Sequence, residues 1–330
     1  MIQGCENPKV ELLARRAPRI SYRLADVDAV LAEPGTLALF SFGTDTPSTD
    51  DPRHFQVALE GFDAPSALEL WQVDGDVSCG EDGALHWSAG GGWLFASIEL
   101  DEREYGGPEG AASAAYAALR EFVGGRAEQQ VLRIWNYLGN INQGAGDSER
   151  YKHFCDGRAQ GMGAFFTEGF PAATAIGHHG PEHRLQVYLL ACDQRGQRVE
   201  NPRQVSAWRY PRQYGRTPPS FARAMALPAQ DALAISGTAA VVGHASAHQD
   251  DVDAQLDETL LNLEALLVSA GMTSGFDTQS PLKTYVRNSG DAARVRAFLK
   301  RRLPGVPVLL LHGDICRSEL LMEIDGWRYA

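Results

Sequence analysis

The sequence predicts an α+β protein, because strands and amphipathic helices follow one another in the same order in both halves of the chain. In the first half, apolar runs separated by Gly, Asp and Pro lead into one helix near residues 110–123. In the second half, the apolar run at residues 232–242 precedes a helix at 252–269. This order predicts two similarly built α+β domains, residues 1–165 and 166–330.

Aromatic and aliphatic runs in the first half predict strands at residues 37–42, 55–59, 67–73, 93–100 and 131–137. The helix at 110–123 places Ala112, Tyr116, Leu119 and Val123 on one face. A second helix is expected to start at the cap Asp147 and to run toward residue 162.

Leucines repeat at helical spacing in residues 252–269, and Gly271 ends that helix. Alternating or continuous apolar residues predict the remaining strands at 185–189, 232–242, 283–287, 306–312 and 318–324, with a helix at 291–302.

The charge and cysteine content restrict the class of protein. The net charge is −12, which argues against a nucleic-acid partner because phosphate binding favours a basic face. The 5 cysteines are scattered and form no CxxC pair, as expected of a reduced protein without structural zinc. Residues 1–8 show no signal-peptide pattern and no apolar run reaches membrane-spanning length, so we expect a cytoplasmic protein without a membrane partner.

Familiar cofactor and metal motifs are absent from the sequence. It contains no GxGxxG after a strand, no GxxxxGK[ST], no HExxH and no GxSxG. His244 and His248 are four residues apart, but no zinc pattern accompanies them, and we interpret them as surface or packing residues. We therefore expect neither a cofactor nor a metal.

The segment at residues 314–326 contains a thiol, Cys316, and a carboxylate, Glu323, seven residues apart. Apolar neighbours disfavour the charged form of a glutamate, so Glu323 between Met322 and Ile324 could serve as a general acid. In an unbroken strand Cys316 and Glu323 would point to opposite faces, so a shared pocket requires a bulge or turn between them. The alternative is that Glu323 is a solvated carboxylate on an edge strand.

Residues 201–221 are rich in arginine, tyrosine and proline. Arginine presents a planar fork that matches a carboxylate, and tyrosine adds a hydroxyl and an apolar wall. In an acidic protein this cluster indicates recognition of a small anion. A surface loop whose arginines pair with the excess acids is the alternative.

Two further segments also contain residues typical of a ligand-binding site. Gly237 interrupts an apolar strand, and glycine inside a strand often marks the close approach of a ligand or of another backbone. Alternation in residues 283–287 would place Lys283, Tyr285 and Arg287 on one face. Together with residues 155–158, these segments offer several cations, one thiol and one glutamate. This combination suits a cofactor-free, acid-catalysed reaction on a substrate that carries a carboxylate.

The chain resembles the chorismatases over residues 130–326. The motifs that carry the resemblance are Trp135-Asn136-Tyr137, Ile141-Asn142, Glu149-Arg150-Tyr151, Gly157-Arg158, Tyr210-Pro211-Arg212-Gln213-Tyr214-Gly215, Pro218-Pro219-Ser220-Phe221, Ile235-Ser236-Gly237-Thr238-Ala239, Asp314-Ile315-Cys316-Arg317 and Glu323-Ile324-Asp325-Gly326. The resemblance implies two RidA/YjgF-like domains, each a mixed β-sheet packed with helices on one face: a degenerate N-terminal domain (residues 1–165) and a catalytic C-terminal domain (residues 166–330). It also implies chorismate as the substrate.

In this family the glutamate matching Glu323 is implied to protonate the enolpyruvyl methylene, so that pyruvate is released. One subfamily then yields a dihydroxycyclohexadienoate, and another aromatises the ring to 3-hydroxybenzoate. Cys316 and Gly237 occupy the positions that go with the aromatising outcome. Some relatives also make 4-hydroxybenzoate, and that product stays open.

Carried over residue by residue, the resemblance implies Glu323 as the acid and Cys316 as an assistant at the ring hydroxyl or ring proton. It further implies a substrate-binding set consisting of Arg158, Tyr210, Arg212, Tyr214, Gly237, Thr238 and Arg287. Three of these, Arg158, Arg212 and Arg287, would bind the two carboxylates.

Two other functions are considered beside this one: a non-catalytic RidA-like module that binds aromatic acids, and an imine-hydrolysing deaminase. The arginine–tyrosine segment speaks against the deaminase, because a small imino acid needs fewer cations. The chain is expected to act as a monomer or a small homo-oligomer.

Overall fold

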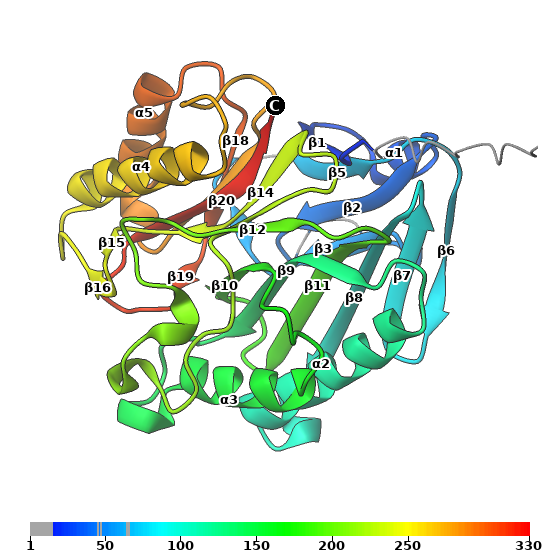
Figure 1. The fold of residues 1–330 in the computed structure, drawn as a ribbon, viewed down its shortest axis with the longest axis horizontal. Coiled ribbons are helices and arrows are strands. Elements are labelled where there is room, and N and C mark those ends of the chain that lie inside the picture. The colour runs from blue at the N-terminus through cyan, green and yellow to red at the C-terminus, as the bar shows by residue number, and fades with distance from the viewer. Residues whose placement is uncertain (1–15, 45, 47, 64–66) are drawn as a thin grey trace, which may run out of the picture.

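Two seven-stranded sheets form the body of the structure, a computed structural model that describes residues 16–44, 46, 48–63 and 67–330. Figure 1 shows the sheets between two pairs of helices, one pair at the bottom of the view and one at the upper left. Each sheet is mixed, because one pair of neighbouring strands in each is parallel and the other pairs are antiparallel. The predicted α+β class, with helices on one face of each mixed sheet, is confirmed.

The first sheet is built mainly from residues before position 192. Its strands, in spatial order, are β19 (Asp314–Ile315), β10 (Ala172–His178), β9 (Gln130–Gly139), β11 (Arg184–Cys192), β8 (Trp93–Asp101), β7 (Leu85–Gly90) and β6 (Val77–Asp82).

The second sheet is built mainly from the C-terminal part of the chain. Its strands, in spatial order, are β12 (Gln197–Val199), β13 (Ala224–Ala226), β14 (Ala232–Thr238), β20 (Met322–Tyr329), β17 (Leu282–Val286), β18 (Val308–His312) and β4 (Glu60–Gly61). β20, near the C-terminus, is therefore an interior strand with a partner on each side.

Helices cover the outer face of each sheet. α2 (Pro108–Gly124) and α3 (Arg150–Met162) pack on the first sheet through residues such as Tyr116, Leu119 and Phe154. α4 (Val252–Ser269) and α5 (Ala292–Arg302) pack on the second sheet. α4 begins where the Asp251 carboxylate accepts a hydrogen bond from the Ala254 amide at 3.1 Å, as expected of a helix cap.

A third core lies between the two sheets. Its largest side chains include Trp135 and Tyr188 of the first sheet and Trp327 of the second. A smaller sheet, in the order β1 (Arg19–Arg23), β5 (Leu68–Gln72), β2 (Thr36–Phe42) and β3 (His54–Val57), adds Trp71 and Phe40 to this core. The remaining described elements are α1 (Val27–Leu31) and the hairpin of β15 (Val241–Val242) and β16 (Ala245–Ser246).

The strand pairing bears on where the two domains meet. β10 and β11 follow residue 165, yet they pair with β9 and β8 of the first sheet. A boundary at 165/166 would therefore divide a hydrogen-bonded sheet. We propose that the boundary between the two domains lies after Cys192 instead.

Three predicted elements have different limits in the structure. α3 begins at Arg150 rather than at a cap on Asp147, because the Asp147 carboxylate pairs with the Arg212 guanidinium instead of with helix amides. β14 ends at Thr238, and residues 241–242 form a separate hairpin strand. The predicted strand at 318–324 is mostly a turn, and β20 begins only at Met322.

No helix in the described ranges combines the length and the apolar character that a membrane crossing requires.

Candidate active site

A cavity of about 290 Å³ lies beside the central strands of the second sheet. The wall of the cavity is formed by the loop before α3, the segment at 204–223, the C-terminal end of β14 and the turn before β20. Lining side chains include Tyr151, Tyr210, Tyr214, Phe221, Arg223, Cys316, Arg317, Glu319 and Glu323. The arginine–tyrosine segment and the thiol–glutamate segment of the sequence therefore meet at one cavity.

Glu323 lies on β20 and is only 6% exposed. Its neighbours Met322 and Ile324 pack toward α4 and α5, while Glu323 points to the opposite face. The pKa of the Glu323 carboxyl is raised to about 8. Burial is the main cause and the negative charge of Asp325 adds to it, while nearby arginines act in the opposite direction. Glu323 is therefore a protonated acid at neutral pH, and the solvated edge-strand alternative does not hold.

A bulge in β14 makes room for the Glu323 side chain. Ile235 pairs with Gly326 and Thr238 pairs with Ile324, so β14 has one more residue than β20 in this interval. A Cβ atom on Gly237 would lie 1.9 Å from Glu323 Oε1, so any side chain at this position would displace the Glu323 carboxyl. The glycine predicted to mark a close approach therefore marks the approach of the backbone to the acid.

Cys316 reaches the same cavity because the chain turns between β19 and β20. Both Cys316 and Glu323 line the cavity, so the bend that their spacing requires is present. Burial, followed by the negative charge of Glu323, raises the pKa of the Cys316 thiol to about 12. Cys316 therefore faces the cavity as a neutral thiol and not as a thiolate.

Arg287 holds this turn in shape. Its Nε donates to the Leu320 carbonyl at 2.8 Å, and its Nη2 donates to the carbonyls of Ile315 and Arg317 at 2.8 and 3.0 Å. Its Nη1 donates to Asn142 Oδ1 at 2.9 Å and to Asp314 Oδ1 at 2.7 Å. A guanidinium has five N–H groups, so all of them are committed within the protein. Arg287 is thus placed to support the turn rather than to bind a substrate carboxylate.

Two other arginines line the cavity without an acidic partner. Among the described residues, no carboxylate forms an ion pair with Arg223 or Arg317. Arg223 Nη2 donates to the Tyr210 hydroxyl at 2.6 Å, and its buried Nε has no described hydrogen-bond partner. The Arg317 guanidinium stacks 4.0 Å from the centre of the Tyr214 ring and 5.0 Å from that of Tyr210. The cavity therefore carries two positive charges that an anionic ligand could neutralise.

The remaining predicted site residues lie outside the cavity wall. Arg212 is largely exposed and forms a bidentate pair with Asp147, and the Thr238 hydroxyl donates to the Ser236 carbonyl at 2.9 Å. Arg158 is buried on α3 with its guanidinium 5.1 Å from the Tyr116 ring, and its Nε and Nη2 have no partner among the described residues. The structure thus brings together Glu323, Cys316, Tyr210, Tyr214 and Gly237, but not Arg158, Arg212, Thr238 or Arg287.

Sequence reasoning did not single out Arg223 and Arg317, which line the cavity. Arg317 belongs to the motif that contains Cys316, and Arg223 follows the arginine–tyrosine segment by two residues. Both arginines therefore lie in or next to the motifs that the sequence analysis singled out. Nothing in the sequence, however, distinguishes an arginine that has an acidic partner from one that lacks it.

The histidines considered as metal ligands have protein partners. His248 contacts Glu258 at 3.0 Å, and His244 contacts the Tyr214 hydroxyl at 3.3 Å. In the described ranges, one group of metal-type donors (Glu109, His153 and Asp156) gathers near the α2–α3 contact, and none of its members lines the cavity.

Comparison with known proteins identifies relatives of the whole chain. The family profile described as "Chorismatase FkbO/Hyg5-like, N-terminal" matches residues 69–191. A 3-hydroxybenzoate synthase from Streptomyces hygroscopicus is 35% identical over 80% of this chain and 82% of its own. A chorismatase from Streptomyces rapamycinicus is 35% identical over 79% of this chain and 82% of its own. A chorismatase crystal structure superposes with a TM-score of 0.84 at 31% identity, covering 96% of this chain and 100% of the other.

Proposed function

The chain belongs to the chorismatase family of enzymes, and from this premise we propose that it converts chorismate to 3-hydroxybenzoate and pyruvate. The observation that carries the proposal is a protonated, buried glutamate in a cavity lined by two arginines that form no ion pair with a carboxylate among the described residues. Chorismate carries two carboxylates and an acid-labile enol ether, so the cavity offers each group a suitable counterpart.

In the proposed mechanism Arg223 and Arg317 bind the two carboxylates. Arginine suits this task because it stays charged and presents paired donors to a carboxylate. The Tyr210 hydroxyl accepts a hydrogen bond from Arg223, and the rings of Tyr210 and Tyr214 stack against the Arg317 guanidinium. These contacts keep both guanidinium groups in place. Phe221 adds an apolar wall against which the substrate ring can pack.

Glu323 then protonates the enolpyruvyl methylene. A pKa near 8 leaves the carboxyl protonated at neutral pH and still able to give up its proton when a positive charge develops next to it. The resulting oxocarbenium makes the ether oxygen a leaving group. The neighbouring ring hydroxyl attacks the ring carbon that carries the ether, the bond from this carbon to the ether oxygen breaks, and pyruvate leaves with that oxygen as its carbonyl. The hydroxyl proton returns to Glu323. The resulting arene oxide opens, the ring loses a proton and the opened oxygen gains one, which gives 3-hydroxybenzoate; the atoms of chorismate are thus shared between the two products and no water is added.

Cys316 is assigned to the step that selects the product. Its thiol faces the same cavity and is neutral, so it can donate or accept a weak hydrogen bond at the ring hydroxyl or ring proton. We expect Cys316→Ala to retain pyruvate release within about tenfold while the products shift toward the dihydroxycyclohexadienoate or 4-hydroxybenzoate. Cys79→Ala, which removes an exposed thiol, is the matched control. An unchanged product ratio in Cys316→Ala would remove the thiol from the mechanism.

Incubation of the purified protein with chorismate tests the proposed function as a whole. We expect equimolar pyruvate and 3-hydroxybenzoate, measured by coupled assay and by chromatography. Pyruvate together with a dihydroxycyclohexadienoate would indicate the hydrolytic subfamily. Thermal stabilisation by benzoates without any pyruvate release would indicate a binding module.

A further inference from the structure

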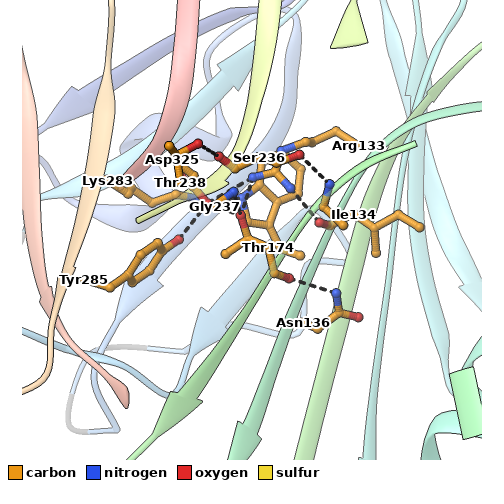
Figure 2. Close-up of polar contacts among 12 residues, drawn as sticks. Arg133, Ile134, Asn136, Thr174, Ser236, Gly237, Thr238, Lys283, Tyr285 and Asp325 are labelled. Atoms are coloured by element: carbon orange, nitrogen blue, oxygen red, sulfur yellow. Dashed lines mark hydrogen bonds and ion pairs between the residues drawn. The ribbon is translucent and has the colours of Figure 1, made fainter. Parts of the chain in front are cut away.

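A buried polar network joins Asp325 and Thr174 with the side chains around them (Figure 2). Its centre is Asp325, which is fully buried and two residues along β20, and therefore on the same face as Glu323. Asp325 Oδ2 accepts hydrogen bonds from four groups: Arg133 Nη2 at 3.0 Å, Trp135 Nε1 at 3.0 Å, the Thr174 hydroxyl at 2.8 Å and the Tyr285 hydroxyl at 2.9 Å. The network thus connects β20 with β9, β10 and β17.

The hydroxyl of Thr174 extends this network toward the cavity. It accepts from Arg133 Nη2 at 2.5 Å and from the Gly237 backbone N–H at 2.9 Å. Its own proton goes to Asp325 Oδ2, so its one donor and both of its acceptor sites are in use. Removal of this hydroxyl would therefore leave the Gly237 backbone N–H without its acceptor.

Gly237 connects the network with the acid. The position of its absent Cβ lies 3.3 Å from Thr174 Oγ1 and 1.9 Å from Glu323 Oε1. The bulge turns the Gly237 N–H away from the ladder with β20, and Thr174 of the other sheet accepts it instead. The position of Thr174 therefore fixes how closely the β14 backbone approaches the Glu323 carboxyl.

From this geometry, and resting on the proposed role of Glu323, we propose that Thr174 and Asp325 are positioning residues that hold the Glu323 carboxyl in its proton-delivering place through the Gly237 backbone. Neither residue lines the cavity, so neither touches the substrate. Their contribution is to the orientation and the charge environment of the acid.

The charges around Glu323 determine what loss of Asp325 would do. The Asp325 carboxylate raises the pKa of Glu323, whereas the Arg133, Arg223 and Arg317 guanidinium groups lower it. Other titratable groups near Glu323 or Asp325 are Cys316 on the turn, Tyr285 and Lys283 on β17, and the buried hydroxyls of Tyr22 on β1, Tyr137 on β9 and Tyr188 on β11. Lys283 is paired to Glu69 at 3.0 Å. Neutralising Asp325 leaves the Arg133 charge without its partner, so the pKa of Glu323 should fall.

Kinetics of two Thr174 variants test the positioning role. Thr174→Val removes the hydroxyl at nearly constant volume, and Thr174→Ser retains it. We expect Thr174→Val to lower kcat for pyruvate release at least about tenfold with KM changed less than threefold, and Thr174→Ser to stay within about threefold of the unaltered protein. Equal kcat in all three proteins would overturn the proposal.

A titration gives a second readout that does not depend on turnover. In protein labelled with ¹³C at the glutamate side-chain carboxyl, the Glu323 resonance is identified by its absence from Glu323→Gln. We expect Asp325→Asn to lower the pKa of Glu323 by about one unit or more, and an unchanged pKa would overturn the proposal. If the unaltered protein releases no pyruvate from chorismate, the proposed function fails, and this titration alone decides the inference.

Discussion

Replacing Glu323 by glutamine is expected to reduce pyruvate release by about 10²- to 10⁴-fold, the range typical of a lost general acid. Glutamine preserves the shape of the side chain and its place under the β14 bulge, but it cannot deliver a proton. The loss should therefore appear in kcat, with KM for chorismate nearly unchanged. Steady-state kinetics with a coupled pyruvate assay measures both constants.

The same replacement is expected to stabilise the folded protein. Burial raises the pKa of Glu323 from its usual value near 4.5 to about 8, so between these pH values the unfolded chain has released a proton that the folded protein retains. The free energy of unfolding therefore falls as the pH rises through this window. At pH 7.5 the free energy of unfolding of Glu323→Gln should exceed that of the unaltered protein by about 2–4 kcal/mol. The contribution of the lost O–H donor is to be subtracted from this gain. Thermal or urea unfolding at pH 4.5 and pH 7.5 measures the difference, which should be present at the higher pH only.

Glu319→Gln is the matched control for this prediction. Glu319 also lines the cavity, but it is less buried and accepts a hydrogen bond from the Ser246 hydroxyl at 2.8 Å. We expect that variant to retain turnover within about fivefold and to gain no stability. If Glu323→Gln kept near-normal turnover, the assignment of Glu323 as the acid would be wrong.

Loss of either cavity arginine is expected to weaken substrate binding by one to two orders of magnitude. Arg223→Met and Arg317→Met each remove a charge-assisted hydrogen bond to a carboxylate, which corresponds to a rise in KM of about 10- to 100-fold. The effect should fall mainly on KM, because the carboxylates keep their charge throughout the reaction.

Arg212→Met is the control for the two arginine variants. Arg212 belongs to the arginine–tyrosine segment at residues 201–221, but its guanidinium is exposed and pairs with Asp147. An exposed ion pair contributes little, so we expect KM within about twofold and an unfolding midpoint close to that of the unaltered protein. A larger effect in Arg212→Met than in Arg223→Met would support the ligand set implied by the sequence resemblance instead.

The raised pKa of Glu323 is expected from the sequence because Met322 and Ile324 flank it, but these two side chains pack on the opposite face of β20. The burial of Glu323 comes instead from its position beside the Gly237 backbone, which the sequence signals only through the glycine. The spacing to Cys316 already requires a bend. The identity of the bend could not be predicted, since it depends on Arg287 binding the carbonyls of Ile315, Arg317 and Leu320 across about thirty residues of chain.

The arginines near the cavity show where the sequence is insufficient. Arg287 and Arg223 are both cations near strand ends, but Arg287 has Asp314 at 2.7 Å while Arg223 has no carboxylate ion-pair partner among the described residues. Whether an acid reaches a given arginine is decided by strand pairing and turns. The same holds for β10 and β11, whose return to the first sheet is a long-range pairing that local periodicity does not encode.

The dependence of kcat/KM on pH tests the central claim most directly, because this ratio reports the ionisation of the free enzyme. If protonated Glu323 is the acid, kcat/KM for pyruvate release should be flat near pH 7 and should fall about tenfold per pH unit above a pKa near 8. A ratio that stays constant or rises between pH 7 and pH 9.5 would contradict the account.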